Sequence, residues 1–144
     1  MKIKILSIGK WKACPERELF ELYKKRITWE LTLQELDPKK NDEAEIILKS
    51  LPENTFTIAL DECGKQFSSI ELSEQMDSWM SHGTSHITFV IGGADGLSSS
   101  ILNKADLKLS FGKMTYPHMM VRPILAEQIY RVETILKGHP YHRS

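Results

Sequence analysis

The stretch that most constrains this chain is the apolar segment at residues 86–91, HITFVI. A strand with one exposed face alternates apolar and polar side chains, whereas a near-continuous apolar run is typical of a strand covered on both faces. Such strands occur chiefly in parallel sheets, because the helices that connect parallel strands cover both faces of the sheet. The segment therefore predicts a central, buried strand of a parallel sheet.

The remaining segments alternate between strand and helix patterns, as an α/β fold requires. Besides residues 86–91, strands are predicted at residues 2–8, 31–36, 55–60 and 107–111. Helices are predicted at residues 15–27, 42–51, 68–83, 98–103 and 123–138. No repeat, low-complexity stretch or linker interrupts this order. We therefore expect one domain over residues 1–144, an α/β fold with a mostly parallel sheet flanked by helices.

Local signals place the helix ends. Prolines are tolerated in the first turn of a helix, so Pro15 and Pro123 mark two predicted starts. A capping-box spacing precedes two further helices, at Asp42 with Glu45 and at Ser68 with Glu71. Apolar stripes at helical spacing then predict the buried faces: Leu19, Tyr23 and Ile27; Ala44, Ile47, Leu48 and Leu51; Leu72, Met76, Trp79 and Met80; Leu125, Ile129, Val132 and Leu136.

The last helix has a second apolar surface, formed by Ile124 and Ile135. One apolar face can meet the sheet, and the other can meet a second copy of the chain across a two-fold axis. The pattern therefore favours a homodimer.

Overall charge and hydropathy exclude some classes of protein. No apolar run approaches the roughly 20 residues that span a bilayer, and the N-terminus does not resemble a signal peptide, so we expect a cytoplasmic protein without a membrane partner. The 19 basic and 19 acidic side chains balance. Residues 1–26 carry eight Lys and Arg against three Asp and Glu, and residues 104–144 carry seven against three, whereas residues 27–103 carry four against thirteen. If the two basic ends meet, they could form a surface for phosphates; otherwise the unevenness is only solvated charge.

Metal binding is not expected. Two cysteines, Cys14 and Cys63, form neither a disulfide framework nor a zinc site. His82 and His86 have helical spacing, but Gly83 interrupts the helix that would align them.

Three segments follow predicted strands, at the edge of the sheet where α/β proteins bind ligands. They are residues 60–64, 92–96 and 112–118. The second, Gly-Gly-Ala-Asp-Gly, matches neither a P-loop nor a dinucleotide fingerprint. Its glycines allow either a tight turn without a ligand or a cradle that a ligand approaches closely.

The C-terminal end carries unusual chemistry. Residues 139–143, His-Pro-Tyr-His-Arg, combine titratable, stacking and phosphate-binding groups behind an apolar helix that must dock. A frayed and inert tail is the alternative. On the preceding helix, Glu127 and Arg131 have the spacing of a surface ion pair, which could equally position groups of an active site.

Four motifs in fixed order resemble one known family over the whole chain. They are residues 89–97 (FVIGGADGL), 109–118 (LSFGKMTYPH), 126–131 (AEQIYR) and 139–143 (HPYHR). The chain resembles the ribosomal large subunit methyltransferase H family, the SPOUT enzymes that methylate N3 of a pseudouridine in 23S rRNA. The resemblance implies a C-terminal trefoil knot, a homodimer, and S-adenosylmethionine as methyl donor without a metal.

The resemblance also implies which residues form the site. The donor is expected to contact Leu60, Gly92, and residues Leu109, Ser110, Phe111, Gly112, Lys113 and Met114. The candidates for base, stacking, charge stabilisation and pocket shape are Tyr141, His142, Arg143, Arg131, Glu127 and His118. The family's tail reaches the active site near the dimer interface. Because the net charge is zero, we expect RNA binding to need two subunits or the assembled ribosome.

Two other function classes fit the same pattern. One is a non-catalytic RNA-binding or ribosome-associated factor with a degenerate cofactor pocket. The other is an α/β enzyme that binds a different adenosine compound.

Overall fold

The strands form one parallel sheet with the order β2-β1-β4-β3-β5. The computed structural model describes residues 1–38 and 42–143. The strands are β1 (Lys2–Ile8), β2 (Glu30–Leu36), β3 (Phe56–Gln66), β4 (His86–Ile91) and β5 (Leu107–Ser110). The helices are α1 (Pro15–Arg26), α2 (Glu43–Ser50), α3 (Ser69–Ser81), α4 (Ser99–Lys104) and α5 (His118–Leu136). The expected α/β class and the central, buried position of residues 86–91 are confirmed, since β4 lies between β1 and β3.

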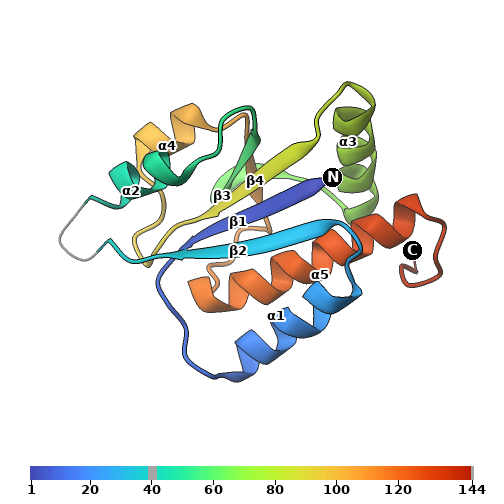
Figure 1. The fold of residues 1–144 in the computed structure, drawn as a ribbon, viewed down its shortest axis with the longest axis horizontal. Helices are drawn as coiled ribbons and strands as arrows, with labels where there is room; N and C mark the ends of the chain where they lie inside the picture. Colours follow the sequence, from blue (N-terminus) through green and yellow to red (C-terminus); the bar gives the residue numbers. More distant parts are fainter. Residues whose placement is uncertain (39–41, 144) are drawn as a thin grey trace.

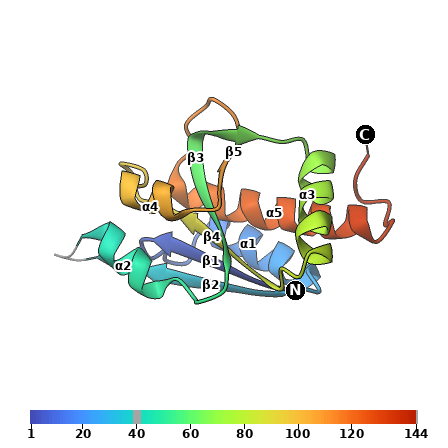
Figure 2. The same ribbon diagram turned by 90° about the horizontal axis from the view of Figure 1, so that it is seen from above.

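Helices cover both faces of the sheet (Figure 1). On one face, α1, α3 and α5 enclose the larger core, in which Phe20 of α1, Met76 of α3 and Ile129 of α5 are buried against the sheet. On the other face, α2 and α4 enclose a smaller core that includes Ile47 and Ile101. In Figures 1 and 2, α5 runs along the sheet, and the C-terminus lies at the end opposite to α2 and α4.

Strand β3 is longer than expected. Residues 61–64, expected as a loop, belong to β3, which pairs with β5 through a shift of register between Leu60 and Lys65. A Cβ atom at Gly64 would lie 2.7 Å from the carbonyl carbon of Lys108, so glycine allows the two backbones to approach here. The bulged segment is polar, as loops usually are, and for this reason the sequence predicted a loop at these residues.

The start of α5 was also predicted wrongly. The helix begins at His118, five residues before Pro123, and Pro123 is buried inside it. A proline near the start of a helix removes only one backbone hydrogen bond, and the first turn keeps the bonds from Met120 and Val121 to the carbonyl of Pro117. The first turn of α5 therefore reaches the carboxyl end of the sheet.

Three smaller predictions fail for local reasons. The Asp42 carboxylate caps α2 by accepting from Ala44 N–H, while Glu45 pairs with Lys49 rather than completing a capping box. By contrast, the capping box at Ser68 and Glu71 is confirmed. Leu19 and Leu48 are exposed, because Phe20 and Ile47 face the core instead.

Candidate active site

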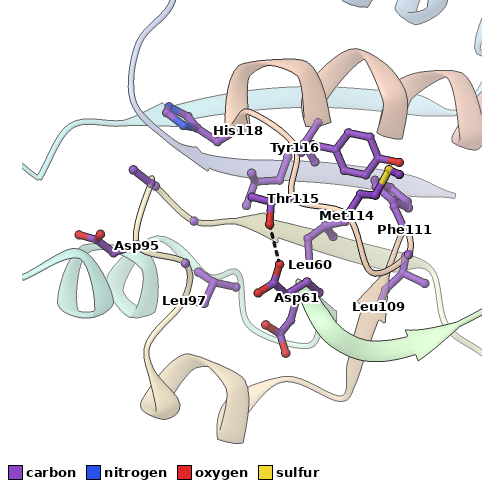
Figure 3. Close-up of a pocket in the computed structure, with 18 residues that line it drawn as sticks. Leu60, Asp61, Asp95, Leu97, Leu109, Phe111, Met114, Thr115, Tyr116 and His118 are labelled. Carbon is purple, nitrogen blue, oxygen red and sulfur yellow. Dashed lines mark hydrogen bonds between the residues drawn. The ribbon is translucent and has the colours of Figure 1, made fainter.

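A cavity of about 350 Å³ opens at the carboxyl ends of β3, β4 and β5 (Figure 3). This volume lies within the range of small-molecule sites. Its walls come from the bulge of β3, the loop after β4, and the segment that joins β5 to α5. They consist of Leu60, Asp61, Glu62, Ile91, Gly92, Gly93, Ala94, Asp95, Gly96, Leu97, Leu109, Phe111, Gly112, Met114, Thr115, Tyr116, His118 and Val121.

The loop after β4 folds back on itself. The Gly96 N–H donates to the Gly93 carbonyl over 3.0 Å, and Gly96 has φ +75°, a conformation that favours glycine. A Cβ at Gly92 would lie 2.9 Å from the Gly96 carbonyl carbon and 3.0 Å from Leu97 Cδ2. Glycine at position 92 is therefore required by the loop itself. Of the two reasons that the sequence left open, a tight turn or the close approach of a ligand, the geometry of the loop supports the first for Gly92.

Side chains hold the segment after β5 against β3. The Ser110 hydroxyl accepts from the Gly112 N–H and lies 3.0 Å from the Glu62 carbonyl. Farther out, Thr115 donates to the Glu62 carboxylate over 3.1 Å, as Figure 3 shows. These contacts fix one wall of the cavity.

The cavity has an acidic rim and apolar walls. Asp61, Glu62 and Asp95 contribute carboxylates, whereas Leu97 and Phe111 are among the apolar side chains. Carboxylates favour a cationic ligand or one with hydroxyl groups, and apolar walls suit a flat ring. The expected site residues omitted these three acids. Their position beside the ends of strands β3 and β4 was the available signal.

The first turn of α5 closes the cavity beside the end of β1. His118 is half-buried and lines the cavity, and its Nε2 would lie 3.5 Å from a Cβ at Gly9. One turn farther along, Arg122 is fully buried. It donates to the Ser7 hydroxyl (2.8 Å), the Gly9 carbonyl (2.7 Å) and the Glu35 carboxylate (3.0 Å). Arg122 thus anchors the first turns of α5 to strands β1 and β2.

Burial of the charged Arg122 side chain costs free energy because the guanidinium loses its contact with water. Its guanidinium carbon lies 4.6 Å from the centre of the Trp11 ring, and Glu35 also accepts from the Trp11 N–H. Burial lowers the pKa of Arg122, and the hydrogen bond and charge of Glu35 partly oppose that shift. A buried cation with this many acceptors is strongly held in one position. We infer that it sets the position of His118 at the cavity.

A second cluster of polar side chains lies along the second half of α5. The Glu127 carboxylate accepts from Arg131 Nε (2.9 Å) and from the Tyr141 hydroxyl (3.0 Å). Arg131 Nη1 lies 3.0 Å from His142 Nδ1, and its guanidinium carbon lies 4.8 Å from the centre of the Tyr141 ring. The tail is therefore docked along α5, and Arg143 beyond it is exposed.

Two pKa values are shifted in this cluster, which we call the tail cluster (Glu127, Arg131, Tyr141 and His142). Burial raises the pKa of Tyr141, and hydrogen bonds to Tyr23 and Glu127 raise it further. The hydrogen bond to Glu127 raises the pKa of Arg131, with burial opposing it. Tyr141 is therefore a neutral hydroxyl at physiological pH, and Arg131 is firmly cationic.

The cavity and the tail cluster are far apart within one chain. Arg131 follows His118 by 13 positions on α5, which corresponds to about 20 Å at 1.5 Å per residue. Figure 1 places the start of α5 and the C-terminus at opposite ends of the sheet. None of residues 139–143 lines the cavity of its own chain.

Comparison with known proteins decides the family. A family model described as "Predicted SPOUT methyltransferase" matches residues 1–142. The chain belongs to the SPOUT methyltransferase family. It is 42% identical, over the full length of both chains, to a protein of Rhodospirillum centenum named ribosomal RNA large subunit methyltransferase H. A protein of the same name from Paramagnetospirillum magneticum is 43% identical over 99% of each chain. The resemblance read from the four motifs is thereby confirmed.

A solved structure supports the fold. A probable methylase family protein from Haemophilus influenzae Rd KW20 superposes with a TM-score of 0.61 at 15% identity, covering 99% of this chain and 70% of that one. At this identity the match shows the fold alone. Among residues 1–38 and 42–143, no helix is long and apolar enough to cross a membrane, and no group of three or more potential metal ligands occurs.

The structure divides the residues expected for a SPOUT site between two places. Of the expected donor contacts, Leu60, Gly92, Leu109, Phe111, Gly112 and Met114 line the cavity. Ser110 lies behind the wall and fixes Gly112, and Lys113 is exposed between two lining residues. Of the other expected residues, only His118 lines the cavity. Glu127, Arg131, Tyr141 and His142 form the tail cluster, and Arg143 lies beside it.

Proposed function

We propose that this protein transfers a methyl group from S-adenosylmethionine to N3 of a pseudouridine in 23S ribosomal RNA, in the cytoplasm and within the assembled ribosome. The observation that carries the proposal is the cavity at the strand ends, built by the glycine loop after β4 in a chain of the SPOUT methyltransferase family. Full-length relatives named as large subunit rRNA methyltransferases support rRNA as the substrate.

The cavity fits the donor chemically. S-adenosylmethionine has a positive sulfonium, an ammonium and ribose hydroxyls, and the acids Asp61, Glu62 and Asp95 can meet such groups. Leu97, Leu109 and Phe111 offer apolar contact to an adenine ring. The folded loop at residues 92–96 presents backbone groups, which recognise a ligand without adding charge. When bound, the donor supplies an electrophilic methyl group.

The protein must also bring the base to that methyl group. The tail cluster holds the chemistry suited to this task, but its members on α5 lie about 14 Å (Glu127) and about 20 Å (Arg131) along the helix from His118 at the cavity. A two-fold dimer that places α5 of one subunit across the cavity of the other brings a tail to each cavity. We therefore infer a homodimer in which the tail works on the partner's cavity.

The contacts of the remaining side chains indicate a different role for each of them. The N3 proton must leave as the nitrogen attacks, and His142, whose ring contacts Arg131, is the residue best suited to accept it. Arg143 is exposed and able to bind phosphate or stabilise negative charge on the base. Tyr141 serves by holding the tail, because its hydroxyl and ring are engaged with Glu127 and Arg131. His118 shapes the cavity.

We also propose that the segment at residues 112–117 passes through a loop of the chain, which forms a trefoil knot. Membership of the SPOUT family supports the knot, and this segment lines the same cavity as the loop at residues 92–97. A knotted chain pulled by its two ends extends less than a linear chain of equal length. A fully extended contour in single-molecule pulling would contradict the knot.

The decisive experiment supplies 23S rRNA, as naked RNA and in large ribosomal subunits, together with labelled S-adenosylmethionine. Mass mapping should find one methylated pseudouridine, preferentially in the assembled particle. Calorimetry should show binding of S-adenosylmethionine and S-adenosylhomocysteine but not of ATP. ATP binding without methyl transfer would favour an enzyme for another adenosine compound. RNA binding without donor binding would favour a non-catalytic factor.

Mixed dimers test whether the tail works in trans. A Gly92→Val chain lacks a working donor loop, and a chain without residues 139–144 lacks the tail. In a verified mixed dimer, the truncated chain keeps an intact cavity and the Gly92→Val chain supplies its tail. Partial activity should return. Continued inactivity would show that the tail serves its own subunit.

A further inference from the structure

The two basic ends of the chain meet beside the tail. The Thr28 N–H, just after α1, donates to the buried Glu133 carboxylate of α5 over 2.7 Å, and Lys137 Nζ lies 2.6 Å from the Thr28 hydroxyl. The hydroxyls of Tyr23 and Tyr141 are 3.4 Å apart. The condition set by the sequence, that the basic ends meet in the fold, is therefore fulfilled at the C-terminal ends of α1 and α5 (Figure 1).

Helix α1 concentrates its positive charge at this end. Its first turn carries Glu16 and Glu18, whereas its last turn is Lys24, Lys25 and Arg26. Within the described part of the chain, these three residues make no ion pair, and neither does Arg143. By contrast, two other cations at this end, Arg131 and Lys137, are paired with glutamates. The uncompensated charge thus lies at the end of α1 and at the tip of the tail.

The arrangement of these cations suits a nucleic acid backbone. Successive helix residues point about 100° apart, so Lys24, Lys25 and Arg26 fan out around the helix end rather than forming one flat stripe. A fan of cations can contact phosphates along a curved strand.

We propose that Lys24, Lys25 and Arg26, together with Arg143, form a surface that binds the RNA phosphates next to the target base. The inference rests on the proposed function, because it assumes that the tail beside this surface acts on RNA. Phosphate contacts fix orientation and register without reading sequence. In a dimer that places the tail at the partner's cavity, this surface comes to the same place, so it would hold the strand on one side of the base.

A basic last turn also stabilises its own helix, so the test must separate the two roles. The variant Lys24→Gln, Lys25→Gln, Arg26→Gln removes three charges from the proposed surface. The matched control, Lys49→Gln, Lys65→Gln, Lys104→Gln, removes three exposed charges from α2, β3 and α4. The probe is a fluorescently labelled RNA hairpin, and its affinity is measured over a range of salt concentrations.

The surface variant should bind the hairpin about tenfold or more weakly at moderate salt. Its plot of log affinity against log salt should be shallower by about two to three units, the contribution of two to three lost phosphate contacts. The control should keep the wild-type slope. Both variants should bind S-adenosylmethionine like the wild type, which shows that the cavity is intact.

Four outcomes would contradict the proposed surface. The first two are an unchanged salt dependence of hairpin affinity in the surface variant, and an equal loss of hairpin affinity in the control variant. The other two are a loss of binding to anionic lipid vesicles rather than to RNA, and no hairpin binding by the wild type. The proposed function is judged separately, by methyl transfer from labelled donor to large ribosomal subunits. If wild-type transfer persists in any of these cases, the function stands and only the surface is wrong. If no transfer occurs, the function fails as well.

Discussion

The two ends of α5 are built on different principles. At its start, the cavity is shaped by backbone: the folded glycine loop, the bulge of β3 and the turn at Gly112. Along its second half, the tail cluster is made of side chains that contact one another, centred on Glu127 at the middle of the helix. A backbone-built cavity recognises a constant ligand, whereas a cluster of titratable side chains can handle protons and charge. Neither end is complete by itself, which is the reason for our proposal that two subunits cooperate.

The two arginines of α5 show the same contrast. Arg122 has 0% of its side chain exposed, and burial lowers its pKa, whereas the partly exposed Arg131 has its pKa raised by Glu127. Arg122 is locked among strand carbonyls and cannot turn toward a ligand. Arg131, one quarter exposed, keeps part of its guanidinium in contact with solvent.

The largest expected effect comes from removing the tail, residues 139–144. Methyl transfer to large ribosomal subunits should fall about 1,000-fold or more, equivalent to some 4 kcal/mol of activation free energy, because the base loses His142 and Arg143 together. Affinity for S-adenosylmethionine, measured by calorimetry, should change little, since the cavity lies at the other end of α5. Equal losses of methyl transfer and of donor affinity would contradict the separation of donor binding, in the cavity, from the role of the tail.

The next effect concerns stability at the two arginines. Arg122→Met removes the donor to Ser7, Gly9 and the Glu35 carboxylate and should lower the free energy of unfolding by about 3 kcal/mol. The same change at Arg131 should cost about 1 kcal/mol or less, because that ion pair is partly solvated. Urea denaturation measures the free energy of unfolding of both variants. Similar losses in the two variants would contradict the difference drawn between Arg122 and Arg131.

A smaller effect is expected at the glycine loop. Gly92→Val forces a side chain against Gly96 and Leu97, so affinity for S-adenosylmethionine should fall about 100-fold, or roughly 2.7 kcal/mol. The control is Gly83→Asn, outside the cavity, where a Cβ meets nothing within 4 Å and asparagine tolerates a positive φ. Near-wild-type binding by a folded Gly92→Val protein would remove this loop from the site.

The smallest effect concerns Tyr141. Its raised folded-state pKa means that the contribution of its hydroxyl to stability is complete below the ordinary tyrosine value of 10.0 and is lost as the pH rises above it. Tyr141→Phe should cost about 1 kcal/mol at neutral pH. It should also remove the latest phase of the tyrosinate absorbance titration. A titration unchanged by the substitution would mean that Tyr141 is not held in this cluster.

Sequence reasoning was most accurate where periodicity is strong. The apolar run of β4 and the capping box at Ser68 identified their elements because burial and helix capping depend on residues within the element itself. It was wrong at Pro123 and at residues 61–64, where contacts from elsewhere in the chain override local signals: the network of Arg122 holds the first turn of α5, and β5 holds the bulge of β3.

The cavity was partly predictable for the same reason. Loops after parallel strands must gather at one edge, which gave the segments at residues 92–96 and 112–118, whereas Leu109, Ser110 and Phe111 followed only from the family resemblance. No sequence pattern revealed how far the tail lies from that edge. This separation depends on the direction in which α5 crosses the sheet, which only the three-dimensional structure provides.

The length of helix α5 fixes both the distance and the relative direction between His118 and the tail cluster. Each residue inserted between His118 and Arg131 would lengthen it by 1.5 Å and turn the tail cluster by about 100° relative to the cavity. One extra residue would point the cluster away from its partner, whereas a full extra turn would nearly restore its direction but displace it by more than 5 Å. The length of α5 should therefore tolerate far less variation than that of α2 or α4, which set no distance between two working groups.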